Sequence, residues 1–264
     1  MSGLSLIRLP VDRDALARWA AVRNYGWADR RGPGGALRGA NFDEGRALHH
    51  LLAETFGKGR LQPFRLIPAP RGAAAQLYAY TRSSRQELLD EAHATALPEA
   101  LAVCEVTSLA EKPMPTDWRS GRRLGFEVRL RPVSRLLKPM PVAGNRPFAA
   151  GAEVDVFLIE ALRRYPGGPP EGEGLKRETV YSAWFAARLD GAARLEGEAV
   201  LTRFARTRVA RQRAAPEGPD AVLQGELSIT DPVRFAALLE NGVGRHRAYG
   251  FGMLLLRPRA RAGC

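Results

Sequence analysis

The chain has 264 residues and a formal net charge of +12, because 40 Lys and Arg outnumber 28 Asp and Glu. Hydrophobic residues make up 45% and charged residues 26% of the chain, which is typical of a globular protein and excludes a wholly disordered one. No apolar run approaches the ~18 residues of a membrane-spanning helix, and the opening MSGLSLIRLP has no signal-peptide pattern. At about 150 residues per domain, the length predicts two domains or one large one.

Arginine carries almost all of the positive charge, since lysine occurs only at positions 58, 112, 138 and 176. The planar guanidinium matches pairs of phosphate oxygens and stacks on bases, so this composition favours a polyanionic partner such as nucleic acid. A basic surface with no specific ligand is the alternative. The two cysteines, Cys104 and Cys264, predict neither a disulfide framework nor a cysteine metal cluster. A reducing compartment, the cytoplasm, is therefore expected.

The first half of the chain alternates between strand and helix patterns. Hydrophobic spacing predicts, in order, a strand at 4–9 ended by Pro10, a helix at 14–23, a helix at 43–56, strands at 63–67 and 76–81, a helix at 84–95, and a strand at 102–109. Residues 24–40 are rich in Gly and Arg and indicate a surface insertion. The order strand, helix, strand, strand, helix, strand is that of a ferredoxin-like unit.

Residues 112–121 contain two prolines and no periodicity, which predicts a linker. It separates an N-terminal domain, 1–115, which carries a histidine helix, from a C-terminal domain, 122–264. In the second domain the pattern predicts a strand at 124–131, an irregular segment at 132–151, helices at 152–163 and 177–189, an extended segment at 193–212, a strand at 222–229, a helix that starts at Pro232 after the cap Asp231, and a strand at 249–256. The expected fold class is α+β, with two tandem ferredoxin-like domains and antiparallel sheets.

A glycine-rich segment, NGVGRHRAYGFGMLL, lies between the last helix and the last strand. Its glycines are Gly242, Gly244, Gly250 and Gly252. Such glycines permit positive φ and close approach to a ligand, and exposed amides beside Arg245 and Arg247 can bind phosphate oxygens. The alternative is an ordinary glycine-rich turn between a helix and a strand.

A second basic segment, TRFARTRVARQR, spans residues 202–213 and contains no acid. Its arginines are Arg203, Arg206, Arg208, Arg211 and Arg213. An extended hairpin with this charge can lie along an RNA helix and contact its phosphates, whereas the alternative is a solvated edge strand that charge protects from aggregation. Arg129 and Arg131 on the polar face of strand 124–131, with Lys138 after it, complete the predicted RNA-binding set.

Two adjacent histidines lie on the helix at 43–56. With Leu48 at zero and about 100° per residue, the apolar side chains cluster within about 80° of it, and His49 falls on the rim at about 100°. His50 falls at about 200° and faces solvent. His49 is therefore the better catalytic candidate, although a rim histidine is commonly structural. No metal-ligand spacing, serine-nucleophile elbow or nucleotide-binding P-loop occurs in the sequence, so neither a metal nor a cofactor is expected.

Four blocks resemble, in order, those of the Cas6e (Cse3, CasE) endoribonucleases of type I-E CRISPR systems. The blocks are LHHLLAETF, FEVRLRP, the helix at 178–189 with Trp184, and GVGRHRAYGFGMLL. The agreement spans most of residues 1–257. The resemblance implies two ferredoxin-like, RRM-like domains, and its catalytic histidine corresponds to His49.

The resemblance also implies an activity and partners. A member of this family binds the stem-loop of CRISPR repeat RNA and cleaves the precursor 3′ of the stem without metal. The 2′-hydroxyl attacks the adjacent phosphate, which leaves a 2′,3′-cyclic phosphate and a 5′-hydroxyl. The crRNA product stays bound, and the protein remains with the other subunits of the Cascade complex.

One position departs from the family pattern. Relatives often carry Tyr one turn before the catalytic histidine, whereas this chain has Arg46. Because arginine stays charged, it is a poor proton donor. We expect Arg46 to stabilise charge beside His49, with Tyr25 as the candidate to replace the phenol of the family. This departure leaves open a catalytically silent subunit that only binds the crRNA hairpin.

Two further alternatives are weaker. A generic RRM protein usually has an aromatic-rich RNA-binding strand, which LGFEVRLR does not match. A membrane-surface role requires basic residues on one amphipathic helix, whereas here they lie on predicted strands and turns.

Overall fold

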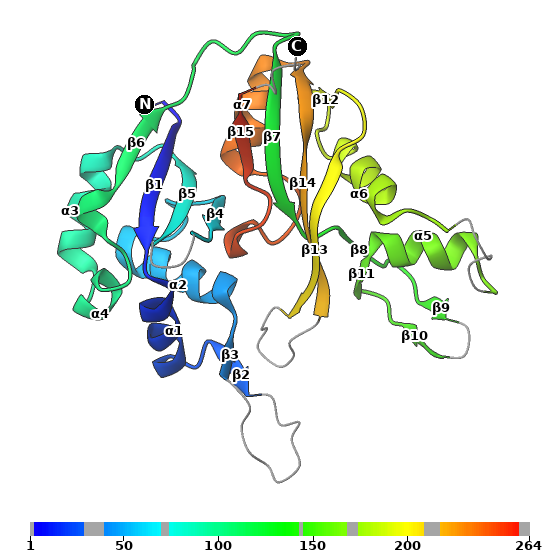
Figure 1. Ribbon diagram of the computed structural model, residues 1–264, viewed down its shortest axis with the longest axis horizontal. Helices are drawn as coiled ribbons and strands as arrows, with labels where there is room; N and C mark the ends of the chain where they lie inside the picture. Colours follow the sequence, from blue (N-terminus) through cyan, green and yellow to red (C-terminus); the bar gives the residue numbers. More distant parts are fainter. Residues whose placement is uncertain are drawn as a thin grey trace.

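The computed structural model describes residues 3–28, 40–69, 74–142, 145–167, 174–208 and 217–258. Two antiparallel sheets lie side by side, each flanked by helices, and one extended connector joins them along one edge of the molecule (Figure 1). The α+β class with two ferredoxin-like domains is thus confirmed. None of the helices within these ranges is long and apolar enough to span a membrane.

The N-terminal sheet has the strand order of a ferredoxin-like unit. Its strands, in spatial order, are β4 (Phe64–Ile67), β5 (Ala75–Thr81), β1 (Ser5–Val11) and β6 (Ala110–Pro113). All three pairings are antiparallel. The accompanying helices are α1 (Arg13–Val22), α2 (Glu44–Phe56), α3 (Arg85–Thr95) and the short α4 (Pro98–Leu101), and a small hairpin pairs β2 (Gly26–Ala28) with β3 (Ala40–Phe42).

The C-terminal sheet repeats this order. Its strands, in spatial order, are β12 (Ala193–Leu195), β14 (Glu217–Ile229), β7 (Arg123–Leu130) and β15 (Leu254–Arg257). The long strand β14 pairs with β12 near its C-terminal end and with β13 (Val200–Arg208) along the rest of the same edge. Its helices are α6 (Arg177–Ala186), α7 (Pro232–Asn241) and the 3₁₀ turn η2 (Arg247–Tyr249). Between β7 and α6 the chain adds β8 (Val133–Arg135), β9 (Met140–Val142), β10 (Asn145–Phe148), β11 (Glu153–Asp155) and α5 (Val156–Arg164).

One face of the N-terminal sheet is buried, and the other is partly covered. Ile7 and Leu9 belong to the core that includes the helices of their own domain. Leu6 and Tyr80 instead pack with the C-terminal core. Because strand side chains alternate between faces, one face of this sheet becomes part of the interface between the domains.

Polar contacts fix this interface. Tyr80 donates a hydrogen bond from its hydroxyl to the Leu254 carbonyl oxygen at 2.9 Å. The Arg65 guanidinium pairs with Glu127 at 3.4 Å, where both side chains are no more than 10% exposed. The connector is also anchored to the second domain, since its Trp118 lies 5.1 Å from Phe235 between ring centroids.

Two strand predictions in the first half were wrong. Pro10 does not end β1, which continues to Val11 paired with β5, while its pairing with β6 stops at Arg8. Proline is tolerated in a strand where it is not required to donate to a neighbour. The strand expected at 102–109 is not formed: α4 ends just before this region, the 3₁₀ turn η1 (Val106–Ser108) lies within it, and, apart from an isolated bridge between Val11 and Cys104, pairing with β1 begins at Ala110. The apolar residues there pack from helical turns, with Pro98 at the first position of α4.

In the second half, several boundaries differ from the prediction. The segment at 132–151 contains β8, β9 and β10, and the helix expected from 152 starts at Val156 because β11 pairs with β8 first. The last strand starts at Leu254, since the preceding residues form the glycine turn. The helix cap at Asp231 is confirmed: its side chain accepts from Val233 and Arg234 amides.

Candidate functional site

Helix α2 places two histidines at the edge of the N-terminal domain. The Asp43 side chain caps the helix by accepting from the Arg46 amide at 2.9 Å, and Gly57 ends it at φ 87°. Leu48 and Leu51 face the core and are 2% and 0% exposed. His49 consequently lies at the rim of the buried stripe, partly exposed, as the spacing predicts.

His49 lies where three segments meet. Its Nδ1 is 3.3 Å from Nε2 of Gln62, in the loop between α2 and β4. Its ring is 5.2 Å from the ring of Tyr249, in the glycine-rich segment of the other domain, and 5.1 Å from that of His50. The ring is thus held between its own helix, the following loop and the C-terminal domain.

These surroundings favour the neutral imidazole. Burial lowers the pKa of His49 below its ordinary value, and the positive charge of Lys58 lowers it further. A hydrogen bond with the Ala248 backbone acts in the opposite direction but is the smallest of the three influences. At neutral pH the free protein therefore carries mainly uncharged His49.

His50 has a different set of neighbours. Its ring stacks on Tyr25 with centroids 4.5 Å apart and planes 7° from parallel. The Arg46 guanidinium lies 5.1 Å from the same Tyr25 ring. The expected partners of His49 therefore contact each other, and Tyr25 also contacts the neighbouring histidine.

The glycine-rich segment, here called the glycine loop (residues 242–252), is a closed turn between α7 and β15. Its four glycines have φ between 70° and 81°, in the region that glycine adopts most easily. The Val243 amide donates to the Gly252 carbonyl at 2.8 Å, and the Gly252 amide donates to the Arg129 carbonyl at 2.7 Å. The base of the loop is thus fixed to β7.

Charged contacts hold the tip of the glycine loop. Glu153 on β11 pairs with Arg245 at 3.0 Å and with Nε2 of His246 at 2.9 Å. Arg247 donates to the Asn241 carbonyl at 2.6 Å. Arg245 and Arg247 are nevertheless exposed and line an open cleft of about 680 Å³. Gln62 and Tyr249 line the same cleft.

The first turn of α2 packs directly on the glycine loop. A Cβ at Gly45 would lie 2.5 Å from the carbonyl oxygen of Tyr249. Only glycine permits this approach without a shift of helix or loop. The contact sets how close His49 comes to the loop.

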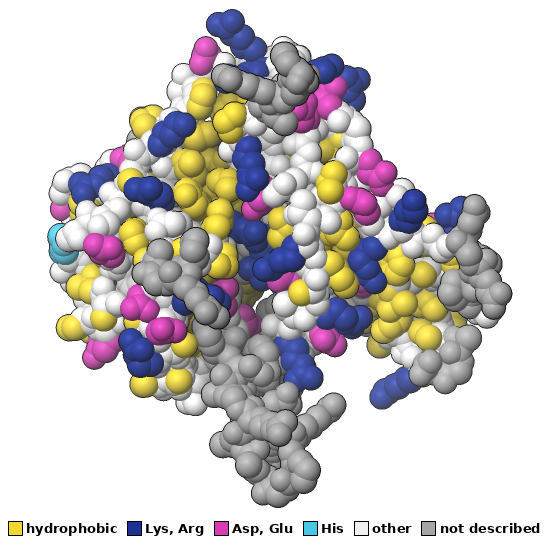
Figure 2. All heavy atoms as spheres, viewed as in Figure 1, with side chains coloured by type: hydrophobic (Ala, Val, Ile, Leu, Met, Phe, Trp, Pro, Cys, Tyr) yellow, Lys and Arg dark blue, Asp and Glu magenta, His cyan; other side chains and the backbone are white. Residues whose placement is uncertain are grey.

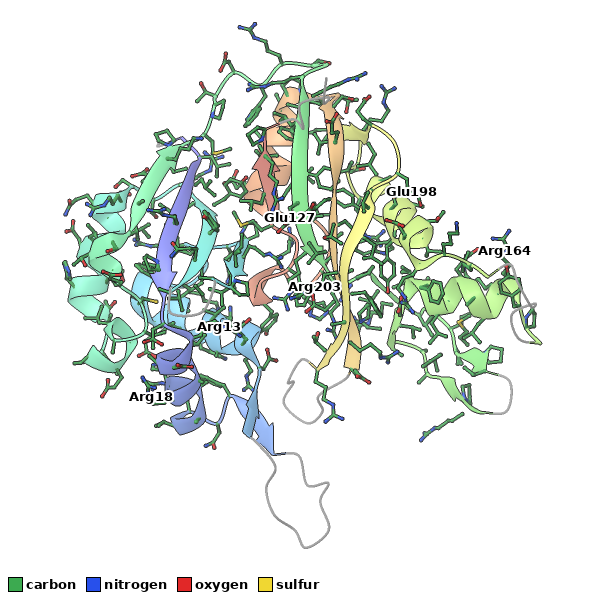
Figure 3. All side chains as sticks on the ribbon, viewed as in Figure 1. Arg13, Arg18, Glu127, Arg164, Glu198 and Arg203 are labelled. Carbon is green, nitrogen blue, oxygen red and sulfur yellow. The ribbon has the colours of Figure 1, made fainter. Side chains whose placement is uncertain are left out.

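A second cleft, of about 760 Å³, lies between the two domains, with Tyr249 shared between the two clefts. We call it the arginine cleft after the arginines that line it: Arg13, Arg65, Arg129, Arg203, Arg206 and Arg208. Figure 2 shows dark blue basic side chains along the boundary between the two halves. In Figure 3, Arg13 and Arg203 lie near this boundary, whereas Arg18 and Arg164 lie toward the outside of the molecule.

A buried carboxylate organises the C-terminal wall of the arginine cleft. Asp220 is 1% exposed and accepts from Arg129 at 2.8 and 2.6 Å and from Arg203 at 3.3 Å. Burial acts to raise the pKa of Asp220, but the two guanidinium groups outweigh it and lower that pKa. On the opposite wall, burial and the nearby Arg129 lower the pKa of Arg65 to about 10, so it still carries its charge at neutral pH.

The remaining predicted cations lie elsewhere. Arg131 is 4% exposed and donates to the Thr207 carbonyl at 3.3 Å, which supports the β13–β14 pair from within. Lys138 lines a separate groove beside α5 and α6. Arg211 and Arg213 lie outside the described residues.

Three residues near His49 were not predicted from the sequence. Tyr249 belongs to the glycine-rich segment but was not selected within it. Gln62 and Lys58 lie in a short polar loop whose sequence gives no signal of proximity to a histidine. Among the described residues, no group of three or more His, Cys, Asp or Glu side chains is arranged to hold a metal ion.

Comparison with solved structures shows what this fold is similar to. The Cse3 protein of Thermus thermophilus, bound to an RNA representing a pre-cleavage complex, is 22% identical with a TM-score of 0.60, over 97% of this chain and 100% of that one. A CRISPR endoribonuclease Cse3 bound to 19 nt RNA is 20% identical with the same TM-score and coverage. Cas6e of Escherichia coli K-12 is 17% identical with a TM-score of 0.56, over 96% of this chain and 99% of that one.

A search of curated proteins finds no match. A family model described as CRISPR associated protein matches residues 6–258, nearly the whole chain. Together with the fold, this match confirms the resemblance found in the sequence. The chain belongs to the family of CRISPR associated proteins.

Proposed function

We propose that the protein is a metal-independent endoribonuclease that binds the stem-loop of CRISPR repeat RNA and cleaves the precursor 3′ of the stem. The observation that carries the proposal is the position of His49, a largely neutral imidazole packed against the glycine loop at the interface between the domains. Two solved structures of the same fold contain Cse3 bound to RNA, which supports RNA as the ligand.

The chemistry requires little beyond orientation and proton transfer. The 2′-hydroxyl attacks the adjacent phosphorus, the new bond closes a 2′,3′-cyclic phosphate, and the bond to the 5′-oxygen breaks. His49 either accepts the proton of the 2′-hydroxyl or, once charged, donates one to the leaving oxygen. Such general acid–base catalysis contributes about 10²–10⁴-fold, and correct placement of a nucleophile within the substrate contributes further.

The arginine cleft and the exposed arginines of the glycine loop supply the binding surface. Guanidinium groups pair with phosphate oxygens along an RNA backbone, and the buried Asp220 keeps Arg129 and Arg203 in fixed positions. The resemblance to Cas6e proteins supports retention of the crRNA product and assembly with the other Cascade subunits in the cytoplasm. Arg245 and Arg247 would then contact RNA on the side of Tyr249 away from the arginine cleft.

The test is cleavage of a repeat hairpin by EDTA-treated protein. We expect one cut 3′ of the stem, with a 2′,3′-cyclic phosphate on the upstream product, and no cut when the nucleotide before the cleavage site carries 2′-deoxyribose. Cleavage that requires an added divalent metal, or that survives the 2′-deoxy substitution, contradicts the mechanism.

The placement of Arg46 favours a second candidate, a subunit that binds the crRNA hairpin without cleaving it. Its guanidinium lies over Tyr25, so neither residue supplies a second catalytic group directly at His49. In that case the same assay gives tight hairpin binding and intact RNA.

A further inference from the structure

Gln62 contacts the ring of His49 from outside its helix. Its Nε2 lies 3.3 Å from Nδ1 of His49. The loop that carries it is firmly packed: Leu61 is 2% exposed, and a Cβ at Gly242 would lie 3.0 Å from Cγ of Pro63. The glycine loop therefore supports the segment from which Gln62 reaches the histidine.

We propose that Gln62 is a positioning residue for His49: its side-chain amide orients the imidazole and holds the neutral ring in the tautomer that carries its proton on Nε2. The inference rests on the proposed function only for its catalytic consequence. The arrangement of the two side chains is a property of the free protein.

The hydrogen-bonding chemistry of the two groups carries the argument. An amide NH₂ group only donates, so Nδ1 must offer its lone pair, and a neutral imidazole with a free Nδ1 has its proton on Nε2. In the orientation that the structure shows, with the amide NH₂ toward Nδ1, the glutamine supports the neutral ring without adding charge.

A carboxylate at the same place would act differently. Glutamate only accepts when ionised, so it would place the neutral ring's proton on Nδ1 and stabilise the charged ring. The groups that face His49 besides Gln62 are Lys58, His50, Tyr249 and the backbone of Ala248. None of these is a carboxylate, so glutamine leaves the low proton affinity of His49 intact.

The test reads the tautomer directly. Full-length protein with ¹⁵N-labelled histidine is titrated by NMR, and His49→Gln identifies the ring signals. We expect the wild-type neutral ring to carry its proton on Nε2. Gln62→Leu should give a mixture of tautomers, and Gln62→Glu should move the proton to Nδ1 and raise the pKa by about 1–3 units. Gln86→Leu, on the exposed face of α3, is the matched control and should leave the tautomer and the pKa of His49 unchanged.

Cleavage assays then separate this inference from the proposed function. We expect Gln62→Leu to lower the single-turnover rate by about 10-fold or more with RNA affinity unchanged, and Gln62→Glu to shift the His49 limb of the pH profile upward. A wild-type ring that already carries its proton on Nδ1, or a tautomer that Gln62→Leu leaves unchanged, overturns the inference even if the RNA is cleaved. The predicted tautomer shifts in a protein that cleaves no RNA support the positioning contact and overturn only the nuclease proposal.

Discussion

The two sides of the domain interface carry different kinds of chemical groups. On the N-terminal side, His49 is held by one amide, one aromatic ring and its own helix, with Lys58 as the charge that acts on its pKa. On the C-terminal side, arginines gather around the buried carboxylate of Asp220. The first side controls the protonation of one group, and the second controls the positions of several charges.

This difference separates chemistry from binding. A largely neutral imidazole suits proton transfer, whereas fixed guanidinium groups suit phosphate binding. The two sets come together because Gly45 on α2 packs against Tyr249 in the glycine loop. Substitutions on the His49 side should therefore impair cleavage, and substitutions on the arginine side should impair RNA binding or stability. A substitution at the contact between Gly45 and Tyr249 should disturb how the two sides are placed relative to each other.

The largest expected effect is on the chemical step. His49→Ala should lower single-turnover cleavage by about 10²–10⁴-fold, because the proton-transfer group is lost. RNA affinity should stay within a few-fold, since the arginine cleft is untouched. His50→Ala, one residue away but stacked on Tyr25, is the matched control and should retain most activity. Equal loss of binding and cleavage in His49→Ala would assign the ring a structural role.

Removal of the buried carboxylate should chiefly lower stability. Asp220→Asn leaves Arg129 and Arg203 without their shared counter-charge, and breaking a buried pair costs about 3–5 kcal/mol in the free energy of unfolding. Chemical denaturation at neutral pH measures the loss, with exposed Asp117→Asn as a control that should stay within about 0.5 kcal/mol. An unchanged denaturation midpoint in Asp220→Asn would mean that Arg129 and Arg203 do not depend on a buried carboxylate for the stability of the fold.

The ion pairs of Asp220 also predict that the stability of the protein depends on pH in the acid range. The pKa of folded Asp220 is lowered, so its stabilising contribution is complete above the unfolded-state value of about 3.9 and is lost as pH falls through the lower folded value. The stability gap between wild type and Asp220→Asn should therefore narrow below that pH.

The contact between the two sides is tested at Gly45. Alanine favours a helix over glycine by about 1 kcal/mol, so α2 should persist, but the added Cβ would lie 2.5 Å from the Tyr249 carbonyl oxygen. We expect cleavage to fall by up to about 10²-fold through displacement of His49, with RNA affinity changed much less. Gly174→Ala, where a Cβ meets nothing within 4 Å, should behave as wild type.

The elements that could be predicted from the sequence are those with a local cause. The α2 boundaries follow from Asp43 and Gly57, and the rim position of His49 follows from helical spacing. The glycine loop was identified because positive φ requires glycine in an otherwise ordinary helix-to-strand connection. By contrast, the strand expected at 102–109 failed because apolar residues can pack equally well from short helical turns.

The neighbours of His49 depend on tertiary packing and carry no local signal. Gln62 reaches Nδ1 only because the loop after α2 folds back beneath the glycine loop. Arg46, three residues before His49, was expected beside it, but its guanidinium is drawn to the Tyr25 ring. Arg131 was expected on the polar face of a half-exposed strand, but it lies just after β7, where contact with Thr207 on β13 leaves it buried.

A smaller effect is expected at the open end of the arginine cleft. Arg208→Gln on β13 removes one exposed charge from the cleft lining. If Arg208 contacts a phosphate, the slope of log affinity against log salt should decrease in magnitude by about 1, with weaker binding at every salt concentration. Cleavage at saturating RNA should be unchanged. Arg18→Gln on α1, outside both clefts, should leave the slope as it is, and an equal effect of the two substitutions would mean that net charge alone governs binding.

The smallest effect concerns the proton affinity of His49. Lys58→Gln removes the charge that lowers the pKa of His49, while burial, the larger influence, remains. The pKa should therefore rise but stay below the ordinary value of 6.5. NMR titration of the free protein measures it, with Lys112→Gln on β6 as the control. Because His49 then becomes protonated at a higher pH, the part of the pH–rate profile that reports its titration should move to higher pH by the same amount. A pKa that does not move would mean that burial keeps this imidazole neutral without the charge of Lys58, so that charge at the interface acts on RNA binding and not on the protonation of His49.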